Sequence, residues 1–324
     1  MMYSRLFSLT ACLLLSWLFL SSPKAAANQS EKGTANPENV GSDFAKLRVQ
    51  ADRGDVIAEY RLGRSYMTGT GVRTDYKEAA KYLHAAAGQG LPEAETVMGY
   101  LYENGKGVPR DYRKAFDYYA AAAKKGDLTA ANNLGVMYRH GHGVRRDFRQ
   151  AVDWHRRAAE GGNVVALCNV GIMYYLGRGV TQSDALAAEW FRKAAENGHA
   201  PGQQILAWMY FMGKGVSRDY AMAAHWVQLA AQIGEPLAQM NLGYLYEEGK
   251  GVPLDYVKAY MWYKTAGSGG DGRAQERLKS LSRLMTGQQI SQANAAASEL
   301  ASSMSKAEVV EESQSIGNAF IPER

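Results

Sequence analysis

The sequence predicts an all-α fold, a right-handed α/α superhelical solenoid built from 36-residue helix-turn-helix repeats. Two observations lead to this prediction. Glycine makes up 34 of the 324 residues and hydrophobic residues 46%, a composition too apolar for a disordered chain. The tetrapeptide Gly-x-Gly-Val also recurs at a constant interval of 36 residues, which is the signature of stacked repeats. Its six copies begin at Gly69, Gly105, Gly141, Gly177, Gly213 and Gly249.

The residues before each glycine motif predict the first helix of a repeat. In the third repeat, Ala130, Leu134 and Tyr138 fall at i, i+4 and i+8, on one face of a helix. Gly135 shares that face, and its small size allows another helix to approach closely. The Gly-x-Gly motif then ends the helix, because glycine adopts left-handed backbone conformations without steric cost. The tyrosine recurs in every repeat, at Tyr66, Tyr102, Tyr138, Tyr174, Tyr210 and Tyr246.

A second helix is predicted after each glycine motif. An aspartate stands where this helix begins and can cap its free amides, at Asp75, Asp111, Asp147, Asp219 and Asp255. The fourth repeat has Ser183 at this position, and serine also caps a helix. A separate departure lies in the first helix of the fifth repeat, where Ala207 replaces the packing glycine. An aromatic residue between two alanines marks the buried face, at Tyr82, Tyr118, Trp154, Trp190, Trp226 and Trp262. We expect these six side chains and the six tyrosines to form the core.

The segment from Leu242 to Gly270 contains all the recurring elements in order. These are Leu-Gly-x-x-Tyr, Gly-x-Gly-Val-x-x-Asp, Lys-Ala and Trp-Tyr-x-x-Ala, followed by the closing glycine. In these elements the chain resembles the Sel-one-like repeat (SLR) family, relatives of the tetratricopeptide repeats, over residues 55–270. The resemblance implies a scaffold that binds a protein or peptide partner on a concave surface lined by the first helices.

Carrying the tetratricopeptide pattern over to this chain selects the inward-facing positions of the first helices. In repeats one to three these positions are mixed and include Tyr60, Arg64 and Tyr100, whereas in repeats four to six they are mostly apolar. The resemblance thus implies a partner-binding surface formed by Ile172, Tyr175, Leu176, Trp208, Phe211, Met212, Met240 and Tyr244. An exposed apolar cluster of this size is typical of partner recognition. The alternative is that these side chains contact each other or the C-terminal tail.

The segments outside the repeats differ in composition from the repeats. Residues 1–27 predict a signal peptide, because Arg5 precedes an apolar stretch from Leu6 to Leu20 and three alanines offer a cleavage site. We therefore expect an exported protein, periplasmic or secreted, and the lipoprotein-like sequence ending at Cys12 is the less favoured alternative. The expected order is a flexible polar leader at 28–41, a capping helix at 42–54, six repeats at 55–270, a degenerate seventh repeat at 271–305 and a flexible tail at 306–324.

Positive charge recurs along the predicted loops. The formal net charge of +5 is too small to indicate a nucleic-acid binder. The middle residue of the glycine motif is nevertheless basic in five repeats, and we call this set the basic loop edge: Lys106, His142, Arg178, Lys214 and Lys250. It is suited to contact with anionic lipid, an acidic partner or a cell-wall polymer. The favoured explanation is that these are ordinary solvated loop charges, partly offset by Glu103 and Glu247.

The sequence lacks a constellation of catalytic residues. His140 and His142 have no carboxylate or cysteine neighbour to complete a metal site, and Cys168 is the single cysteine after the predicted signal. We therefore expect no enzyme, no cofactor and no metal. The predicted function is an exported scaffold in envelope signalling, envelope assembly or host contact. The alternatives are a cell-wall polymer binder and a β-lactamase-like hydrolase; the second is implied by cysteine-rich members of the family and disfavoured by the lone cysteine.

Overall fold

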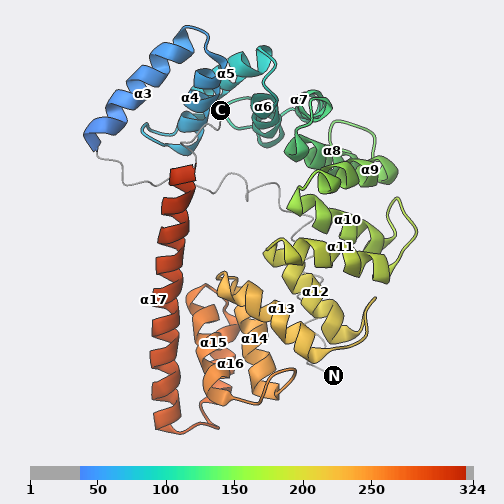
Figure 1. Cartoon of the computed structure of the whole chain (residues 1–324), viewed down its shortest axis with the longest axis vertical. Helices are drawn as coiled ribbons and strands as arrows, with labels where there is room; N and C mark the ends of the chain where they lie inside the picture. Colours follow the sequence, from blue (N-terminus) through green and yellow to red (C-terminus); the bar gives the residue numbers. More distant parts are fainter. Residues whose placement is uncertain (1–36, 319–324) are drawn as a thin grey trace. The chain divides into compact units, whose positions relative to one another are not determined.

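The computed structural model describes residues 37–318, and all regular secondary structure in this range is helical (Figure 1). Helix α3 (Pro37–Asp52) precedes six helix pairs. The pairs are α4 (Val56–Thr68) with α5 (Tyr76–Gly88), α6 (Pro92–Asn104) with α7 (Tyr112–Lys124), α8 (Leu128–His140) with α9 (Phe148–Glu160), α10 (Val164–Leu176) with α11 (Asp184–Glu196), α12 (Ala200–Met212) with α13 (Tyr220–Gln232), and α14 (Pro236–Glu248) with α15 (Tyr256–Ser268). Helices α16 (Arg273–Leu281) and α17 (Gly287–Asn318) follow the pairs.

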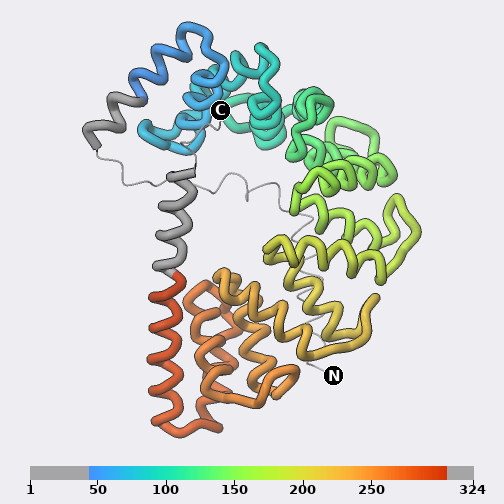
Figure 2. The backbone as a smooth tube through the Cα atoms, viewed as in Figure 1, coloured from blue at the N-terminus to red at the C-terminus, as the bar shows by residue number. Residues whose placement is uncertain are grey.

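The helix pairs repeat with a constant geometry. Each of their helices has 13 residues, as in α6 and α7, and the two helices of a pair pack against each other. Seven residues separate the helices within a pair and three separate one pair from the next (Figure 2). The prediction of an all-α solenoid of helix pairs is therefore confirmed. The described chain divides within α10 into an N-terminal unit, with residues 37–166, 178–181 and 312–318, and a C-terminal unit, with residues 167–177 and 182–311.

The two helices of a pair meet at the packing glycine. A methyl group on Gly99 of α6 would lie 2.6 Å from the ring of Tyr119 on α7, and one on Gly135 of α8 would lie 2.6 Å from the ring of His155 on α9. Both distances are shorter than van der Waals contact, so only glycine allows the second helix to reach this depth. The predicted small-residue contact between the helices is thus present in the structure.

The core is displaced by one residue from the position that the sequence predicts. In each second helix, the predicted alanines are buried, and the residue larger than alanine that is at most 1% exposed directly follows the predicted aromatic residue: Leu83, Tyr119, His155, Phe191, Val227 and Tyr263. Of the twelve predicted core aromatics, only Tyr66, Tyr82, Trp226 and Trp262 are buried, and the other eight are half-buried. Two of the half-buried rings, Tyr102 and Tyr118, stack on each other at 5.7 Å. The expectation that all twelve form the core was therefore wrong for eight of them, because the packing glycine faces the next residue along the helix.

The glycine motif joins each helix pair to the pair before it. Gly105 ends α6 with a φ of 66°, and its N–H donates to the carbonyl of Leu101. Gly107 lies against the backbone carbonyl of Tyr76, the first residue of α5, where a Cβ atom would be 1.8 Å from the oxygen. The same approach recurs at 31-residue offsets, between Gly143 and Tyr112, Gly179 and Phe148, Gly215 and Asp184, and Gly251 and Tyr220. Each loop therefore docks onto the start of the preceding second helix.

The predicted N-terminal caps of the second helices are confirmed. The carboxylate of Asp111 accepts hydrogen bonds from the backbone amides of Arg113 and Lys114, both at 3.0 Å. In the fourth repeat, Ser183 Oγ accepts from the amide of Leu186 at 3.2 Å, so the serine replaces the aspartate without loss of the cap.

The helices outside the six pairs extend further than the sequence suggested. Helix α3 begins at Pro37, inside the predicted leader and five residues before the predicted start at 42, since proline is compatible with the first turn of a helix. Helix α16 has only nine residues, and α17 continues to Asn318 through most of the predicted flexible tail. It continues because no glycine or proline interrupts residues 288–316. Residues 1–27, the predicted signal peptide, lie outside the described residues, as do residues 28–36 of the predicted leader.

Helix α17 begins with a capping box and packs on the last helices of the C-terminal unit. Thr286 Oγ1 accepts from the amide of Gln289 at 3.2 Å, and Gln289 Oε1 accepts from the amide of Thr286 at 2.8 Å. Ala293 of α17 belongs to a buried cluster with Ala266 of α15 and Leu281 of α16. Between residues 37 and 318, no helix combines the length and the apolarity that a bilayer crossing requires.

Candidate functional site

Most of the predicted partner-binding surface is covered in the structure. Ile172, Trp208, Phe211, Met240 and Tyr244 are buried, contrary to the expected exposed cluster. The remaining three predicted residues, Tyr175, Leu176 and Met212, are half-buried. The exposure expected from the sequence is therefore wrong for five of the eight residues.

The buried residues of this cluster cover one another within the C-terminal unit. The ring of Tyr175 meets that of Trp208 edge-on at 5.8 Å, and the rings of Phe211 and Tyr244 lie 6.4 Å apart. Lys250 Nζ lies 5.8 Å from the Phe211 ring and 5.0 Å from the Tyr244 ring. Replacing these rings would remove packing as well as any binding contact. A binding role for this surface stays a prediction. Any contact with a partner would have to come from the half-buried residues Tyr175, Leu176 and Met212.

Four of the five side chains of the basic loop edge fold back onto the preceding repeat. Each of the four contacts the residue 30 positions earlier, at the start of a second helix. The aromatic pairs are Lys106 with Tyr76, His142 with Tyr112 and Arg178 with Phe148, at 5.0, 4.4 and 5.5 Å. Where Asp184 replaces the aromatic residue, Lys214 forms an ion pair with it at 4.0 Å. The recurring basic residue thus contributes to the docking of each loop, a role that the sequence analysis missed.

The first helices of the N-terminal unit surround a pocket of about 220 Å³, which we call the first-helix pocket. Its lining comes from the first helices of three consecutive repeats and one cap: Tyr60, Arg64 and Met67 of α4; Glu93, Thr96, Val97 and Tyr100 of α6; Thr129 and Asn133 of α8; and Asp127, the N-cap of α8. The apolar walls, such as Val97 and Met67, pack against the buried core of the unit. The pocket is therefore held by rigid helices and not by a loop.

The first-helix pocket contains polar atoms that lack partners. Arg64 Nη1 donates to the hydroxyl of Tyr60 at 3.3 Å, but Arg64 Nε is buried and makes no hydrogen bond within the described residues. The same is true of Thr96 Oγ1 on the neighbouring helix. Asp127 is engaged, because its carboxylate accepts from the amide of Ala130 at 2.7 Å. The hydroxyl of Tyr100 accepts from Lys106 Nζ at 2.8 Å, and this hydrogen bond raises the pKa of Lys106.

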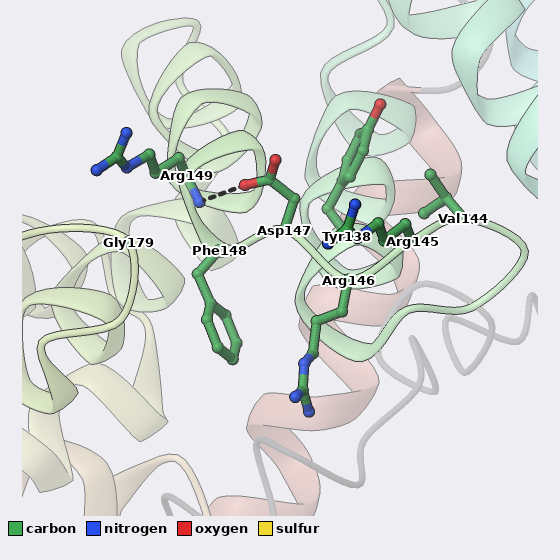
Figure 3. A pocket seen from close by; sticks show the side chains of 8 residues that line it. All are labelled: Tyr138, Val144, Arg145, Arg146, Asp147, Phe148, Arg149 and Gly179. Atoms are coloured by element: carbon green, nitrogen blue, oxygen red, sulfur yellow. Dashed lines mark hydrogen bonds between the residues drawn. The ribbon is translucent and has the colours of Figure 1, made fainter.

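A second, more open pocket of about 680 Å³ lies at the start of α9, and we call it the arginine pocket (Figure 3). Arg145, Arg146 and Arg149 line it together with Tyr138, Val144, Asp147, Phe148 and Gly179. It belongs entirely to the N-terminal unit and includes part of the loop that carries Arg178.

The histidines of the third repeat are stacked and favour the neutral form. The rings of His140 and His142 lie 5.3 Å apart. Burial, assisted by Arg139 and the neighbouring His142, lowers the pKa of His140 to about 4. In the described part of the chain, no three His, Cys, Asp or Glu side chains are placed to hold a metal ion. Cys168 is buried, which does not suit a nucleophile that must reach a substrate.

The sequence pointed to part of the first-helix pocket. Tyr60, Arg64 and Tyr100 were among the inward positions, whereas Val97 and Asn133 were missed. Val97 and Asn133 occupy the same position in consecutive repeats, so the 36-residue spacing could have identified them together. The arginine pocket was not predicted, because none of its lining residues belongs to the basic loop edge and Arg145, Arg146 and Arg149 lie outside the recurring motif.

Comparison with known proteins gives a consistent family assignment. The model of the Sel1 repeat matches six consecutive segments, residues 56–91, 92–127, 128–163, 164–199, 200–235 and 236–271. No functionally curated protein matches the chain. One similar solved structure is a protective antigen present in uropathogenic Escherichia coli strains, which displays an SLR fold; its TM-score is 0.69 and its sequence identity 36%, over 79% of this chain and 56% of that one.

A second similar structure is a Sel1 repeat protein from Oxalobacter formigenes, with a TM-score of 0.60 and 26% identity, over 72% of this chain and 97% of that one. The present chain thus spans only 56% of the length of the Escherichia coli antigen and nearly all of the Oxalobacter protein. The consecutive family matches, the 36-residue helix pairs and these structural neighbours lead to one conclusion: the chain belongs to the Sel1 repeat family, whose repeats form scaffolds for protein–protein interaction.

Proposed function

We propose that this protein is an exported scaffold that binds a segment of a protein partner in the first-helix pocket. One observation carries the proposal: an apolar pocket spans three consecutive repeats and contains buried polar atoms without partners. Buried hydrogen-bonding groups in native proteins are nearly always satisfied, so the unsatisfied groups beside this pocket mark it as a candidate ligand site.

The size of the pocket favours a polypeptide side chain over a free small molecule. Pockets for drug-sized ligands measure roughly 300–1,000 Å³, and this one measures about 220 Å³. One large apolar side chain fits between Met67 and Val97, with the rings of Tyr60 and Tyr100 beside it. The rest of the partner would run along the first helices, where further contacts are available.

The polar atoms fit the main chain of such a partner. The side chains of Arg64 and Thr96 supply donors, and a backbone carbonyl of the partner supplies the acceptor that both lack. Because α4 and α6 are rigid, little ordering is needed when the partner binds, which favours affinity.

Export rests on the signal-peptide features of residues 1–27. The similar protein from uropathogenic Escherichia coli is described as a protective antigen, and access to antibodies is compatible with export of a relative. Within the envelope or outside the cell, the scaffold would serve signalling, assembly or host contact. Cell fractionation followed by N-terminal sequencing tests this part; an uncleaved chain in the cytoplasm would contradict it.

In-cell crosslinking tests the binding site. A photoreactive amino acid replaces Val97 in the pocket, and a matched control carries it at Leu254, which is 58% exposed in a loop of the C-terminal unit. We expect a specific adduct with position 97 only, and we expect Arg64→Ala combined with Tyr100→Ala to reduce that adduct at least severalfold while helical circular dichroism is unchanged.

Two results of the crosslinking would contradict the proposed site. One is equal capture at positions 97 and 254, and the other is capture at 97 that survives the double substitution. A photoreactive group at Tyr175 in the same experiment tests the surface predicted in repeats four to six. A pull-down on purified peptidoglycan and a nitrocefin assay test the cell-wall and hydrolase alternatives.

A further inference from the structure

The third repeat, residues 128–163, is the most basic of the six. It has six arginines against three carboxylates, a formal charge of +3, whereas the other five repeats range from −1 to +2. Its arginines are Arg139, Arg145, Arg146, Arg149, Arg156 and Arg157. The third repeat therefore carries the largest net positive charge, followed by the first at +2.

The loop and first turn of α9 collect three of these arginines around one pocket. Arg145 and Arg146 lie in the loop before α9, and Arg149 lies in its first turn. Figure 3 shows the guanidinium of Arg146 beside Phe148, Arg145 near Tyr138, and Arg149 on the other side of Asp147. The cationic groups are thus distributed around the pocket of about 680 Å³ and do not converge on one point.

The charge of these arginines is not balanced by carboxylates. The one acidic residue of the pocket, Asp147, caps α9, where its Oδ1 accepts from the amides of Arg149 at 2.9 Å and Gln150 at 3.1 Å. Over the described range 37–318, Arg145, Arg146 and Arg149 take part in no ion pair. In contrast, Arg113 at the position of Arg149 in the second repeat pairs with Asp117 at 3.5 Å.

The ring of Phe148 holds two cations near each other. The guanidinium carbons of Arg146 and Arg178 both lie 5.5 Å from its centroid. A cation–π contact holds a guanidinium in place but leaves its charge and most of its N–H donors available. An anion beside Phe148 would therefore meet the guanidinium of Arg146 and lie near the positive charge of Arg178.

We propose that the arginine pocket binds a ligand that carries several phosphate groups, either a soluble oligophosphate or a cluster of phospholipid headgroups. The planar fork of the guanidinium matches two phosphate oxygens, which makes arginine the suited residue for such contacts. The spread of the three arginines favours several linked charges over a single ion. This site is independent of the first-helix pocket and does not rest on the proposed protein partner.

Direct binding measurements test the proposal on the purified full chain. The probes are tripolyphosphate in calorimetry at low salt, and vesicles of phosphatidylglycerol and phosphatidylcholine in flotation, with pure phosphatidylcholine vesicles for comparison. Arg145→Gln, Arg146→Gln and Arg149→Gln are combined in one variant. We expect the affinity of this triple variant for the probe to fall by at least about tenfold, because three charge-assisted contacts are lost.

A matched variant separates the site from net charge. Lys81→Gln, Arg113→Gln and Lys258→Gln remove the same charge at exposed positions where each cation already pairs with a carboxylate. We expect this control to bind within about twofold of the wild type and both variants to keep the helical circular dichroism.

The outcomes are distinct. Binding of tripolyphosphate alone supports a soluble ligand, and flotation with phosphatidylglycerol alone supports a headgroup, provided that the arginine variant loses it. The proposal is overturned if the wild type binds neither probe, if the arginine variant binds like the wild type, or if the control variant loses as much binding as the arginine variant.

Discussion

Gly171 on α10 lies so close to Phe191 on α11 that a methyl group on the glycine would be 2.8 Å from the ring. The equivalent glycines face Leu83, Tyr119, His155 and Tyr263 in the other repeats that keep this residue. The fifth repeat has Ala207 and, at the position of Phe191, the smaller Val227, and both are buried. A larger residue on the first helix is thus matched by a smaller one on the second.

Substitution of a packing glycine should overpack the helix pair. We expect Gly99→Ala to lower the free energy of unfolding by about 1–3 kcal/mol, because the new methyl group would lie 2.6 Å from the buried ring of Tyr119. Gly88→Ala on α5 is the matched control, since nothing lies within 4 Å of its Cβ position. The control should stabilise the protein by up to about 1 kcal/mol through helix propensity. Urea unfolding followed by circular dichroism measures both, and equal effects would refute the packing argument.

The size exchange in the fifth repeat predicts a rescue. Val227→Phe alone should destabilise the protein by about 1–3 kcal/mol, because Ala207 occupies the space that a glycine leaves open elsewhere. Adding Ala207→Gly restores the combination found at Gly171 and Phe191, and we expect it to recover most of the loss. A double-mutant cycle by urea unfolding measures the coupling, and strictly additive effects would contradict it.

The ion pair between Lys125 and Glu95 joins the two helices of the second repeat. Lys125 Nζ donates to Glu95 Oε1 at 2.8 Å and to the carbonyl of Gly90 at 2.9 Å, and Glu95 is only 7% exposed. Lys125→Met leaves this carboxylate without its charged partner, so we expect a loss of about 2–4 kcal/mol in the free energy of unfolding.

The first repeat supplies the matched control for this ion pair. There Gln89 Nε2 donates to Glu59 Oε2 at 2.8 Å and to the carbonyl of Gly54 at 3.2 Å. Lys125→Gln should therefore keep both hydrogen bonds and lose less than about 1 kcal/mol. If the methionine and glutamine variants unfold at the same urea concentration, the hydrogen bonds to Lys125 are not what stabilises this junction.

The cap of α12 should make stability depend on pH. His199 Nδ1 accepts from the amide of Gly202 at 3.2 Å, and burial lowers the pKa of His199 from 6.5 to about 4. Between these values the unfolded chain binds more protons than the folded chain, so stability falls as the pH falls from 6.5 towards 4. By pH 4, this residue is expected to have lowered the free energy of unfolding by about 2–3 kcal/mol.

Replacing the histidine isolates its contribution. Asn163 caps the first helix of the fourth repeat at the equivalent position, accepting from the amide of Ala166 at 2.9 Å. We expect His199→Asn to keep the cap and to flatten the decrease of the unfolding free energy between pH 6.5 and 4. An unchanged pH profile in this variant would show that other groups cause the acid sensitivity.

The repeats and their helix boundaries could be predicted because they depend on local chemistry. A glycine at positive φ and an aspartate cap act within a few residues, and both recur at Gly105 and Asp111 as expected. The position of the core was off by one residue, since Trp154 and His155 are neighbours and only the distance between helices decides which is buried. The extension of α17 over residues 306–318 was missed, because this stretch lacks an apolar stripe.

The candidate site was harder to predict, because exposure depends on how repeats pack on one another. Trp208 and Phe211 were expected to be exposed on the inward face, but rings from adjacent first helices cover them. On the first helices of the N-terminal unit, the mixture of Arg64, Thr96 and Val97 fills the space less completely and leaves a pocket. The residue types at single positions do not reveal this difference, since it comes from the sum of the volumes of neighbouring side chains.

The docking of each glycine loop onto the preceding second helix restricts how this array can change in evolution. Gly107 must reach the carbonyl of Tyr76 while Gly99 faces Tyr119, so spacings of 31 and 20 residues have to be kept together. Inserting or deleting one residue inside a unit shifts at least one of these contacts and disrupts the junction with a neighbour. Gain or loss of an entire 36-residue unit preserves both spacings. We therefore expect relatives of this chain to differ in the number of units far more readily than in the length of a unit.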